Sequence, residues 1–352
     1  MKLDERLFQE EATYAAIEQQ LPTASVGPLT LESGVQLDEV EIVYQTWGAL
    51  APQADNAILV CHALSGDSDA ASWWSRIVGT GRALDPDRYF IIGTNVLGGC
   101  RGSTGPLSMN PATGRPYGGE FPAITIGDMV TAQQRLMQTL GIDCPLLVCG
   151  GSMGGMQALE WARRDATKSV WLTASCARHN AMQIAFNEVA RQAIFADPKF
   201  NNGHYNPDDA PNAGLAVARM IGHISYLSAD SFEHKFGRQR QADAPELFQV
   251  ESYLRYQGRK FTGRFDANSL IALTRAIDTY SCDSLAGSTA RCLWTAFSSD
   301  WLYLPSQSEE LHAMALAAEL ESHLEVIDLP FGHDSFLLDD QVQAARVTEF
   351  LG

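Results

Sequence analysis

The fold of this chain is decided by residues 150–157, which read Gly-Gly-Ser-Met-Gly-Gly-Met-Gln. They follow the apolar run 145–149 and precede the helix-forming stretch 158–164, so the pattern predicts a strand, a tight turn and a helix. Such a turn holds the residue at its tip, here Ser152, in a strained backbone conformation, and its neighbours must be small. Four glycines meet this demand: Gly150, Gly151, Gly154 and Gly155.

Two backbone N–H groups are predicted to face the hydroxyl of Ser152. Met153 opens the predicted helix, where the helix N-terminus stabilises a developing negative charge. The short apolar run 56–61 is typical of a strand buried on both faces of a parallel sheet. In a fold with this turn, the loop after that early strand supplies the second N–H, which assigns Leu64 to the role by position. We interpret His62 in the same loop as a packing residue, because nothing places its ring against Ser152.

A serine hydroxyl becomes a good nucleophile when an imidazole accepts its proton and a carboxylate orients that imidazole. In this fold the three groups occur in the order Ser, Asp, His, each at the C-terminal end of a strand. Asp300 and His333 each follow a late predicted strand, and His333 lies in a glycine-flanked loop. We therefore predict a triad of Ser152, Asp300 and His333. Asp300 could alternatively be a turn or helix-capping residue, and Asp334 is the weaker candidate for the acid because it adjoins His333.

A long helical stretch separates the strands of this alternating α/β chain. Strand-like runs stop near residue 178, and the helical patterns that follow cover residues 181–195, 214–221, 244–256 and 267–279. We predict an α/β-hydrolase fold with a mostly parallel central sheet flanked by helices. Its core domain would be residues 1–178 and 291–352, with residues 179–290 as an inserted helical lid. The same helices could also form a self-association surface.

The bulk composition limits the partners of the chain. The formal net charge of -17 over 352 residues argues against a nucleic-acid partner or an anionic membrane surface. No run reaches the roughly eighteen apolar residues of a membrane span. Residues 1–20 are charged and predicted to be helical, unlike a secretory signal. We therefore expect a cytoplasmic protein, in which the seven cysteines are free thiols because no CxxC pair occurs.

Eight stretches spread over nearly the whole chain closely resemble the homoserine O-acyltransferase family of methionine biosynthesis. They are HALSGDSDAASWW (62–74), DRYFIIGTNVLGGCRGSTGP (87–106), GGSMGGMQALEWA (150–162), AFNEVARQAI (185–194), ARMIGHISYLS (218–228), FTGRFDANS (261–269), SSDWLY (298–303) and GHDSFLL (332–338). Three of them lie inside the helical insertion, where ordinary esterases vary. They are therefore more specific than the turn around Ser152 alone.

The resemblance implies an acetyltransferase that uses acetyl-CoA and L-homoserine and yields O-acetyl-L-homoserine. Ser152 would attack the thioester, the N–H groups of Leu64 and Met153 would stabilise the oxyanion, and His333 would pass the proton. Homoserine would then take the acetyl group from Ser152, which is a double displacement through a covalent intermediate. The family implies no permanently bound cofactor, no metal and a homodimer formed through the helical insertion.

The resemblance also implies substrate-binding residues. Arg219 matches an arginine that holds the homoserine carboxylate, a role suited to a bidentate guanidinium. Asp334 matches the acid that holds the amino group, and Tyr226 matches a tyrosine near the substrate. Similar proteins that use succinyl-CoA tend to carry arginine where this chain has Leu302. Because a buried succinyl carboxylate without a cation is costly, Leu302 favours acetyl as the donor group.

Several alternatives stay open from the sequence. The donor could be succinyl-CoA, the acceptor could be L-serine, or water could take the acyl group, as in a serine hydrolase or esterase. A scaffold without activity is disfavoured by the intact predicted triad. Asp69 stands where relatives commonly have histidine, and Leu304 stands where proline is usual. We expect any effect of these two departures at the entrance or the donor pocket.

Overall fold

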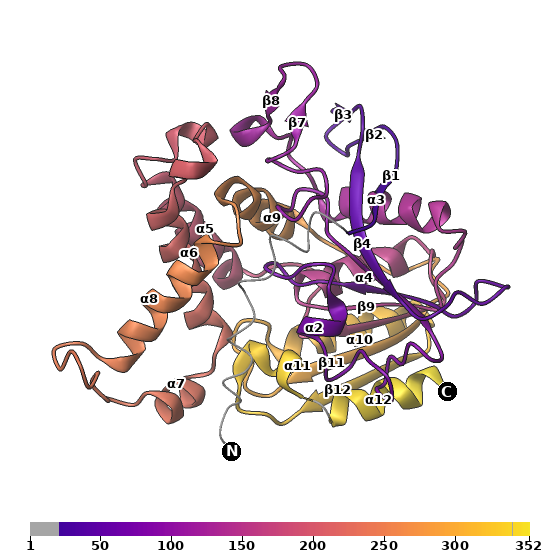
Figure 1. Ribbon diagram of the computed structural model, residues 1–352. Helices are drawn as coiled ribbons and strands as arrows, with labels where there is room; N and C mark the ends of the chain where they lie inside the picture. Colours follow the sequence, from indigo (N-terminus) through magenta and orange to yellow (C-terminus); the bar gives the residue numbers. More distant parts are fainter. Residues whose placement is uncertain (1–20, 340) are drawn as a thin grey trace.

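An eight-stranded sheet runs through the computed structural model, which describes residues 21–339 and 341–352 (Figure 1). In spatial order the strands are β1 (Thr23–Ser25), β4 (Glu41–Trp47), β6 (Phe90–Thr94), β5 (Ala57–Cys61), β9 (Leu147–Gly151), β10 (Ser169–Thr173), β11 (Arg291–Phe297) and β12 (Ser322–Ile327). Pairing is parallel from β6 to β12, and antiparallel between β1 and β4 and between β4 and β6. The predicted mostly parallel sheet is confirmed.

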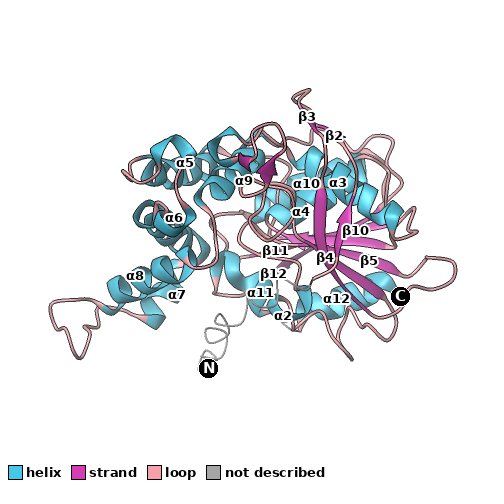
Figure 2. Cartoon of the chain, turned by 45° about the horizontal axis from the view of Figure 1, so that its top comes forward, coloured by secondary structure: helices cyan, strands magenta, loops and turns pink. Residues whose placement is uncertain are grey.

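Helices cover both faces of the sheet (Figure 2). One face carries α3 (Ile126–Thr139), α4 (Met153–Arg163) and α10 (Pro305–Ala317), and the other carries α2 (Ala70–Trp73), α11 (Ser335–Leu338) and α12 (Val342–Leu351). Strand β5 shows why both faces must be covered by helices. Leu59 and Cys61 belong to the apolar cluster on the face that carries α3 and α4, while Ile58 and Val60 belong to the cluster on the opposite face. Its continuous apolar run is therefore buried on both faces.

The chain between β10 and β11 forms the helices beside the sheet at the left of Figure 1. They are α5 (Ala181–Phe195), α6 (Asn212–Tyr226), α7 (Ala229–Lys235), α8 (Gln249–Thr262) and α9 (Ala267–Thr279). Local capping fixes where they start: the Asn180 side chain accepts hydrogen bonds from the N–H groups of Met182 and Gln183 at the beginning of α5. The division into a core domain and a lid domain stays a prediction.

The predicted bounds are right for two of these helices and wrong for the others. Helices α5 and α9 match the predicted stretches 181–195 and 267–279. Helix α8 begins at Gln249 and ends at Thr262, whereas 244–256 was predicted; at Ala244 the ring of Pro245 disfavours a helical conformation. Helix α6 is longer than the predicted 214–221, and α7 was not predicted at all.

The N-terminal strands pair differently from the prediction. From the sequence, residues 27–31 and 40–47 are predicted to be two strands joined by a turn at Ser33-Gly34. In the structure β2 (Leu29–Thr30) pairs with β3 (Gln36–Leu37), while β4 joins the large sheet. A second small hairpin joins β7 (Met109–Asn110) and β8 (Arg115–Pro116). The helix predicted within residues 1–20 lies outside the described residues. Across the described part of the chain, no helix combines the length and apolar character that crossing a membrane requires.

Candidate active site

Strand β9 ends in a tight turn that carries Ser152 at its tip. Ser152 has φ 56° and ψ -123°, a conformation that costs a residue other than glycine roughly 1–3 kcal/mol. The surroundings hold the backbone there, since the N–H of Ser152 donates to the Thr173 carbonyl at 3.1 Å and its carbonyl accepts from the Ser175 hydroxyl at 2.8 Å. The strained turn predicted from the sequence is present.

The glycines of the turn allow the end of β5 to approach it closely. A Cβ on Gly150 would lie 2.4 Å from the carbonyl oxygen of Cys61, and one on Gly154 would lie 2.1 Å from the same atom. Cys61 is the last residue of β5, so this contact brings the following loop, with Leu64, against the turn. Leu64 and Ser152 both line the same pocket. Met153 is the first residue of α4, and its N–H is one of those left without a partner inside a helix.

Asp300 and His333 meet at the ends of β11 and β12. The Nδ1 atom of His333 lies 2.8 Å from Oδ2 of Asp300, and both side chains are buried. The other carboxylate oxygen, Oδ1, accepts hydrogen bonds from the N–H groups of Leu302 at 3.0 Å and Tyr303 at 2.8 Å. Asp300 therefore stabilises the turn that contains it and also contacts the imidazole of His333. The carboxylate that contacts the imidazole of His333 is that of Asp300, and not that of Asp334.

Tyr303 lines the same pocket as Ser152. Among the described residues no hydrogen bond joins Ser152 to His333. Burial raises the pKa of Tyr303 well above its usual value. The Tyr303 ring stacks on the imidazole of His333, with 4.7 Å between ring centroids and 18° between planes. Hydrogen bonds of catalytic groups are often long before substrate binds, so this geometry remains compatible with a triad.

A pocket lies over Ser152 between the sheet and the inserted helices. Its empty space, counted with the open mouth, is about 710 Å³. Five residues singled out from the sequence line it: Leu64, Ser152, Arg219, Tyr226 and Leu302. The predicted residues Met153, Asp300, His333 and Asp334 are not in this lining. The first three of them are buried behind it.

Helix α6 brings two of the predicted binding residues to this pocket. The guanidinium of Arg219 lies over the Phe261 ring at 4.7 Å from its centroid, and Nη1 is 3.2 Å from the Ser65 hydroxyl. Tyr226 lies about two turns further along α6 and places its ring centroid 5.9 Å from that of His333. Because a guanidinium has five N–H donors, Arg219 keeps donors for an anionic group beside Ser152.

Asp334 follows His333 and lies under helix α6. Burial raises the pKa of this carboxyl to about 6, while the nearby positive charges of His333 and Arg219 oppose the rise. Lys235 of α7 is a further positive neighbour of Asp334. Asp334 therefore titrates close to neutral pH and can be an ionised or a neutral group under ordinary assay conditions.

Sequence reasoning missed two residues of the pocket, His179 and Tyr303. His179 is the first residue of the predicted insertion and lies far in the sequence from the predicted triad. Tyr303 follows Asp300 by three positions and so had to lie near the triad, which is the signal that could have found it. Both line the pocket.

The two departures from the family pattern lie away from the pocket lining. Asp69 caps helix α2, where its carboxylate accepts from the Ser72 N–H at 3.3 Å. Leu304 precedes Pro305, the first residue of α10. Within residues 21–339 and 341–352, no group of three His, Cys, Asp or Glu side chains is arranged to hold a metal ion.

Comparisons with known proteins agree with this geometry. A family description of the alpha/beta hydrolase fold matches residues 56–340. A homoserine O-acetyltransferase of Solidesulfovibrio magneticus is 47% identical over 92% of this chain and 89% of its own length. A homoserine O-succinyltransferase of Dechloromonas aromatica is 46% identical over 89% of this chain and 91% of its own length. The crystal structure of esterase E22 superposes with a TM-score of 0.88 at 28% identity, covering 95% of this chain and 100% of the esterase.

The two relatives at 46–47% identity both name homoserine, and they differ in the acyl group. The relatives at 46–47% identity span most of this chain, including the inserted helices that line the pocket. With the turn at Ser152 and the His333–Asp300 contact in place, the chain belongs to the homoserine O-acyltransferase family, on the α/β-hydrolase fold.

Proposed function

We propose that this chain transfers the acetyl group of acetyl-CoA to the side-chain hydroxyl of L-homoserine. The products are O-acetyl-L-homoserine and CoA, and no permanently bound cofactor takes part. The observation that carries this proposal is the position of Arg219, an arginine in the pocket over a serine on a nucleophile turn. An esterase of simple acyl groups has no need of a cation there, whereas an amino-acid acceptor brings a carboxylate.

The reaction follows from the groups around Ser152. The serine oxygen bonds to the thioester carbon as His333 takes its proton, and the N–H groups of Leu64 and Met153 stabilise the oxyanion. The carbon–sulfur bond breaks, and the proton passes to the sulfur of CoA. The homoserine hydroxyl then gives its proton to His333 and bonds to the acyl carbon. The bond from that carbon to Ser152 breaks, and the serine regains a proton.

Arg219 is the proposed partner of the homoserine carboxylate. We expect Arg219→Lys to raise the KM for homoserine about 10- to 100-fold and to change the KM for acetyl-CoA little. The reason is that an ammonium cannot form the two parallel hydrogen bonds of a guanidinium. Steady-state rates of CoA release at varied homoserine would measure this. An unchanged KM for homoserine would show that Arg219 does not bind the homoserine carboxylate.

Asp334 is the proposed partner of the homoserine amino group, with Tyr226 beside it. The carboxyl has a pKa raised to about 6 by burial, so it is neutral below that pH and ionised above it. Transfer from acetyl-Ser152 to homoserine should therefore weaken as the pH falls through about 6, and Asp334→Asn should be slow at every pH.

Acylation of Ser152 by p-nitrophenyl acetate is the internal control for this pH effect. It needs His333 but not Asp334, so it reports the titration of the triad alone. If acylation and transfer lose rate over the same pH range, and Asp334→Asn leaves that range unchanged, Asp334 does not bind the acceptor.

The pocket lining supports acetyl over succinyl as the transferred group. Among the described residues that line it, Arg219 is the one arginine or lysine, and Leu302 is buried against it with 8% of its surface exposed. If Arg219 engages the acceptor, a succinyl carboxylate would be buried without a cation, which costs more than the roughly 1–3 kcal/mol of an unpaired neutral polar group. We expect acetyl-CoA to exceed succinyl-CoA in kcat/KM by at least about tenfold.

The same assay separates transfer from hydrolysis. The similarity to esterase E22 favours water as the second candidate acceptor. Release of CoA from acetyl-CoA should depend on homoserine, and L-serine should compete poorly. Release at an equal rate without homoserine would identify a hydrolase, and preference for succinyl-CoA would identify a succinyltransferase.

The predicted homodimer and cytoplasmic location remain proposals. Exposed apolar side chains on the inserted helices support self-association: Met182 and Val189 on α5, Val217 and Ile224 on α6, and Tyr256 on α8. Sedimentation velocity at several protein concentrations would measure the mass of the particle, and a monomer at all of them would reject the dimer.

A further inference from the structure

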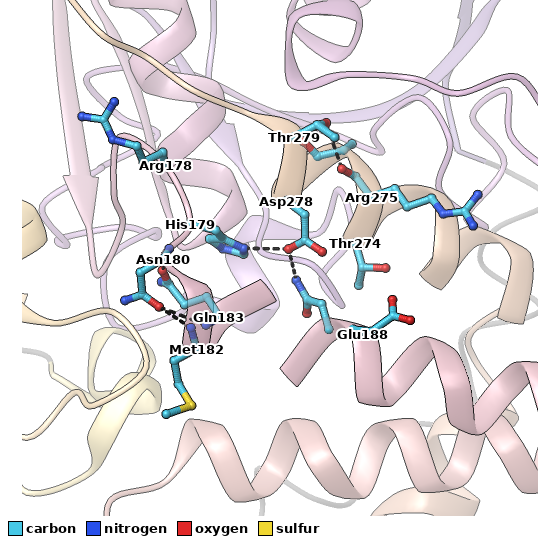
Figure 3. Close-up of polar contacts among 12 residues, drawn as sticks. Arg178, His179, Asn180, Met182, Gln183, Glu188, Thr274, Arg275, Asp278 and Thr279 are labelled. Atoms are coloured by element: carbon cyan, nitrogen blue, oxygen red, sulfur yellow. Dashed lines mark hydrogen bonds and ion pairs between the residues drawn. The ribbon is translucent and has the colours of Figure 1, made fainter. Parts of the chain in front are cut away.

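A second histidine–carboxylate pair lies beside the pocket, at the start of the insertion. Nδ1 of His179 is 2.9 Å from Oδ1 of Asp278, and Nε2 of His179 is 2.7 Å from the hydroxyl oxygen of Tyr303. Figure 3 shows the imidazole of His179 pointing at the carboxylate of Asp278, which belongs to α9. Asp278 also accepts from Asn187 and Arg191 of α5, each at 2.7 Å. The pair therefore joins two helices of the insertion to Tyr303, which lies after strand β11 of the sheet.

Asp278 is ionised and holds His179 in place. Burial alone would raise the pKa of this carboxyl, but hydrogen bonds from His179, Asn187 and Arg191 outweigh it and hold the pKa below its usual value. The side chains of His179 and Asp278 expose only 4% and 10% of their surface, so water competes little for their contact. The imidazole is thus held at both ring nitrogens, by Asp278 on one side and by Tyr303 on the other.

Tyr303 lies between this pair and the imidazole of His333. Its ring stacks on that imidazole, with 4.7 Å between ring centroids and 18° between planes. Two other rings contact His333 at steeper angles: Phe336 at 62° and Tyr226 at 42°, with centroids 5.5 and 5.9 Å away. Tyr303 is the nearest of the three rings and the most nearly parallel, so its face sets the plane of the imidazole.

The hydrogen bond to Asp300 fixes only one atom of the His333 ring. It holds Nδ1, but the ring could still tilt about that atom and move Nε2, which exchanges the proton with Ser152 in the proposed reaction. Tyr303 covers one face of the ring, and its own N–H donates to Oδ1 of Asp300 at 2.8 Å. A single turn, residues 300–303, therefore supplies both the contact at the edge of the imidazole and the contact at its face.

We propose that Tyr303 is a positioning residue for His333, and that His179 and Asp278 hold Tyr303 in place from the insertion. The phenol ring sets the plane of the imidazole, and His179 fixes the hydroxyl end of the phenol. This inference rests on the proposed acyl-serine function, in which His333 carries the proton in both half-reactions. The insertion then aligns the base of the reaction as well as lining the pocket.

The proposed role predicts an equal loss of rate in both half-reactions. His333 takes the proton of Ser152 when the acyl-enzyme forms, and it takes the proton of homoserine when the acyl-enzyme breaks down. A misaligned imidazole should therefore slow both steps by a similar factor. A residue needed only for folding would instead lower the fraction of active molecules, which the burst amplitude reports, and would leave the rate constant of that fraction unchanged.

Tyr303→Leu and His179→Leu test the two parts of the proposal. Rapid-quench acylation by p-nitrophenyl acetate gives the burst amplitude and the first rate constant, and homoserine added to isolated acetyl-enzyme gives the second. Tyr303→Leu removes the stacked ring and should slow both steps about 100-fold at full amplitude, since an error of about 1 Å can cost that much. His179→Leu keeps the ring but not its hydrogen bond, and it should slow both about tenfold. His179→Gln, whose amide can bond to the phenol, should recover most of that loss.

Tyr205→Leu is a matched control. Tyr205 is a part-buried tyrosine of the insertion that donates to the carboxylate of Asp266 and packs near the ring of Phe200, but it does not line the pocket. Both rate constants should stay at wild-type values in this variant, even if its melting temperature falls.

Three results for Tyr303→Leu would overturn the inference: unchanged rate constants, a lower burst amplitude alone, or a loss confined to one half-reaction. Wild-type rate constants in His179→Leu would show that the insertion does not hold Tyr303. Absence of any acyl-enzyme in the wild-type protein would instead overturn the proposed function.

Discussion

Replacing Ser152 by alanine is expected to lower homoserine-dependent CoA release by about 10⁴-fold or more. Without the hydroxyl there is no atom to carry the acetyl group, and His333 and the oxyanion N–H groups are left to act on a direct attack. Mass spectrometry after acetyl-CoA alone should find an acetyl group on the peptide containing Ser152 in the wild type and none in the variant.

We expect Ser152→Ala to leave the stability of the folded state nearly unchanged. Alanine carries the same kind of backbone strain at φ 56°, and no side-chain hydrogen bond of Ser152 caps helix α4. Ser225→Ala is a matched control, because Ser225 also lines the pocket but donates only to the carbonyl of Gly222 in its own helix. It should retain activity within about threefold. Substantial activity in Ser152→Ala would place the acyl group elsewhere, and an unmodified wild-type peptide under rapid quench would indicate direct transfer.

The residues that sequence reasoning assigned to the triad are set by a local pattern plus a rule of topology. Ser152 is marked by glycines on both sides and by a strand before it. Asp300 and His333 follow from the rule that the ends of parallel strands share one edge of the sheet. His62 was interpreted as a packing residue, and its ring indeed bonds to backbone: Nδ1 to the Ala63 carbonyl at 2.7 Å and Nε2 to the Val96 N–H at 3.3 Å.

The contacts that could not be predicted join parts of the chain through the inserted helices. His179 and Asp278 are separated by 99 positions, and their contact depends on how α9 packs against the start of the insertion. No periodicity encodes that orientation, since the helices of the insertion are set by packing on one another. The pairing of β2 with β3 could not be predicted either, because strands of two residues are too short to show an alternation of apolar and polar side chains.

Gly154→Ala is the second change with a large expected effect, a loss of about 100-fold or more in kcat/KM together with a lower melting temperature. Alanine is the better helix former by about 1 kcal/mol, so propensity alone would stabilise α4. The new Cβ, however, would lie 2.1 Å from the carbonyl oxygen of Cys61 and 2.8 Å from its carbon, and both are backbone atoms that no rotamer change can move. Overpacking of this kind costs roughly 1–3 kcal/mol, which outweighs the propensity gain.

The loss of activity in Gly154→Ala should exceed what instability explains. To relieve the clash, the end of β5 must separate from the turn, and this moves the N–H of Leu64 away from Ser152. A displacement of about 1 Å in such a group can cost about 100-fold in rate. Gly263→Ala is the matched control. Gly263 has φ -79°, and the new Cβ would lie 3.7 Å from the carbonyl oxygen of Lys260, which is ordinary van der Waals contact. Thermal denaturation and acylation by p-nitrophenyl acetate would compare the two variants. Wild-type rates in Gly154→Ala would show that the contact between β5 and the turn does not set the position of the oxyanion site.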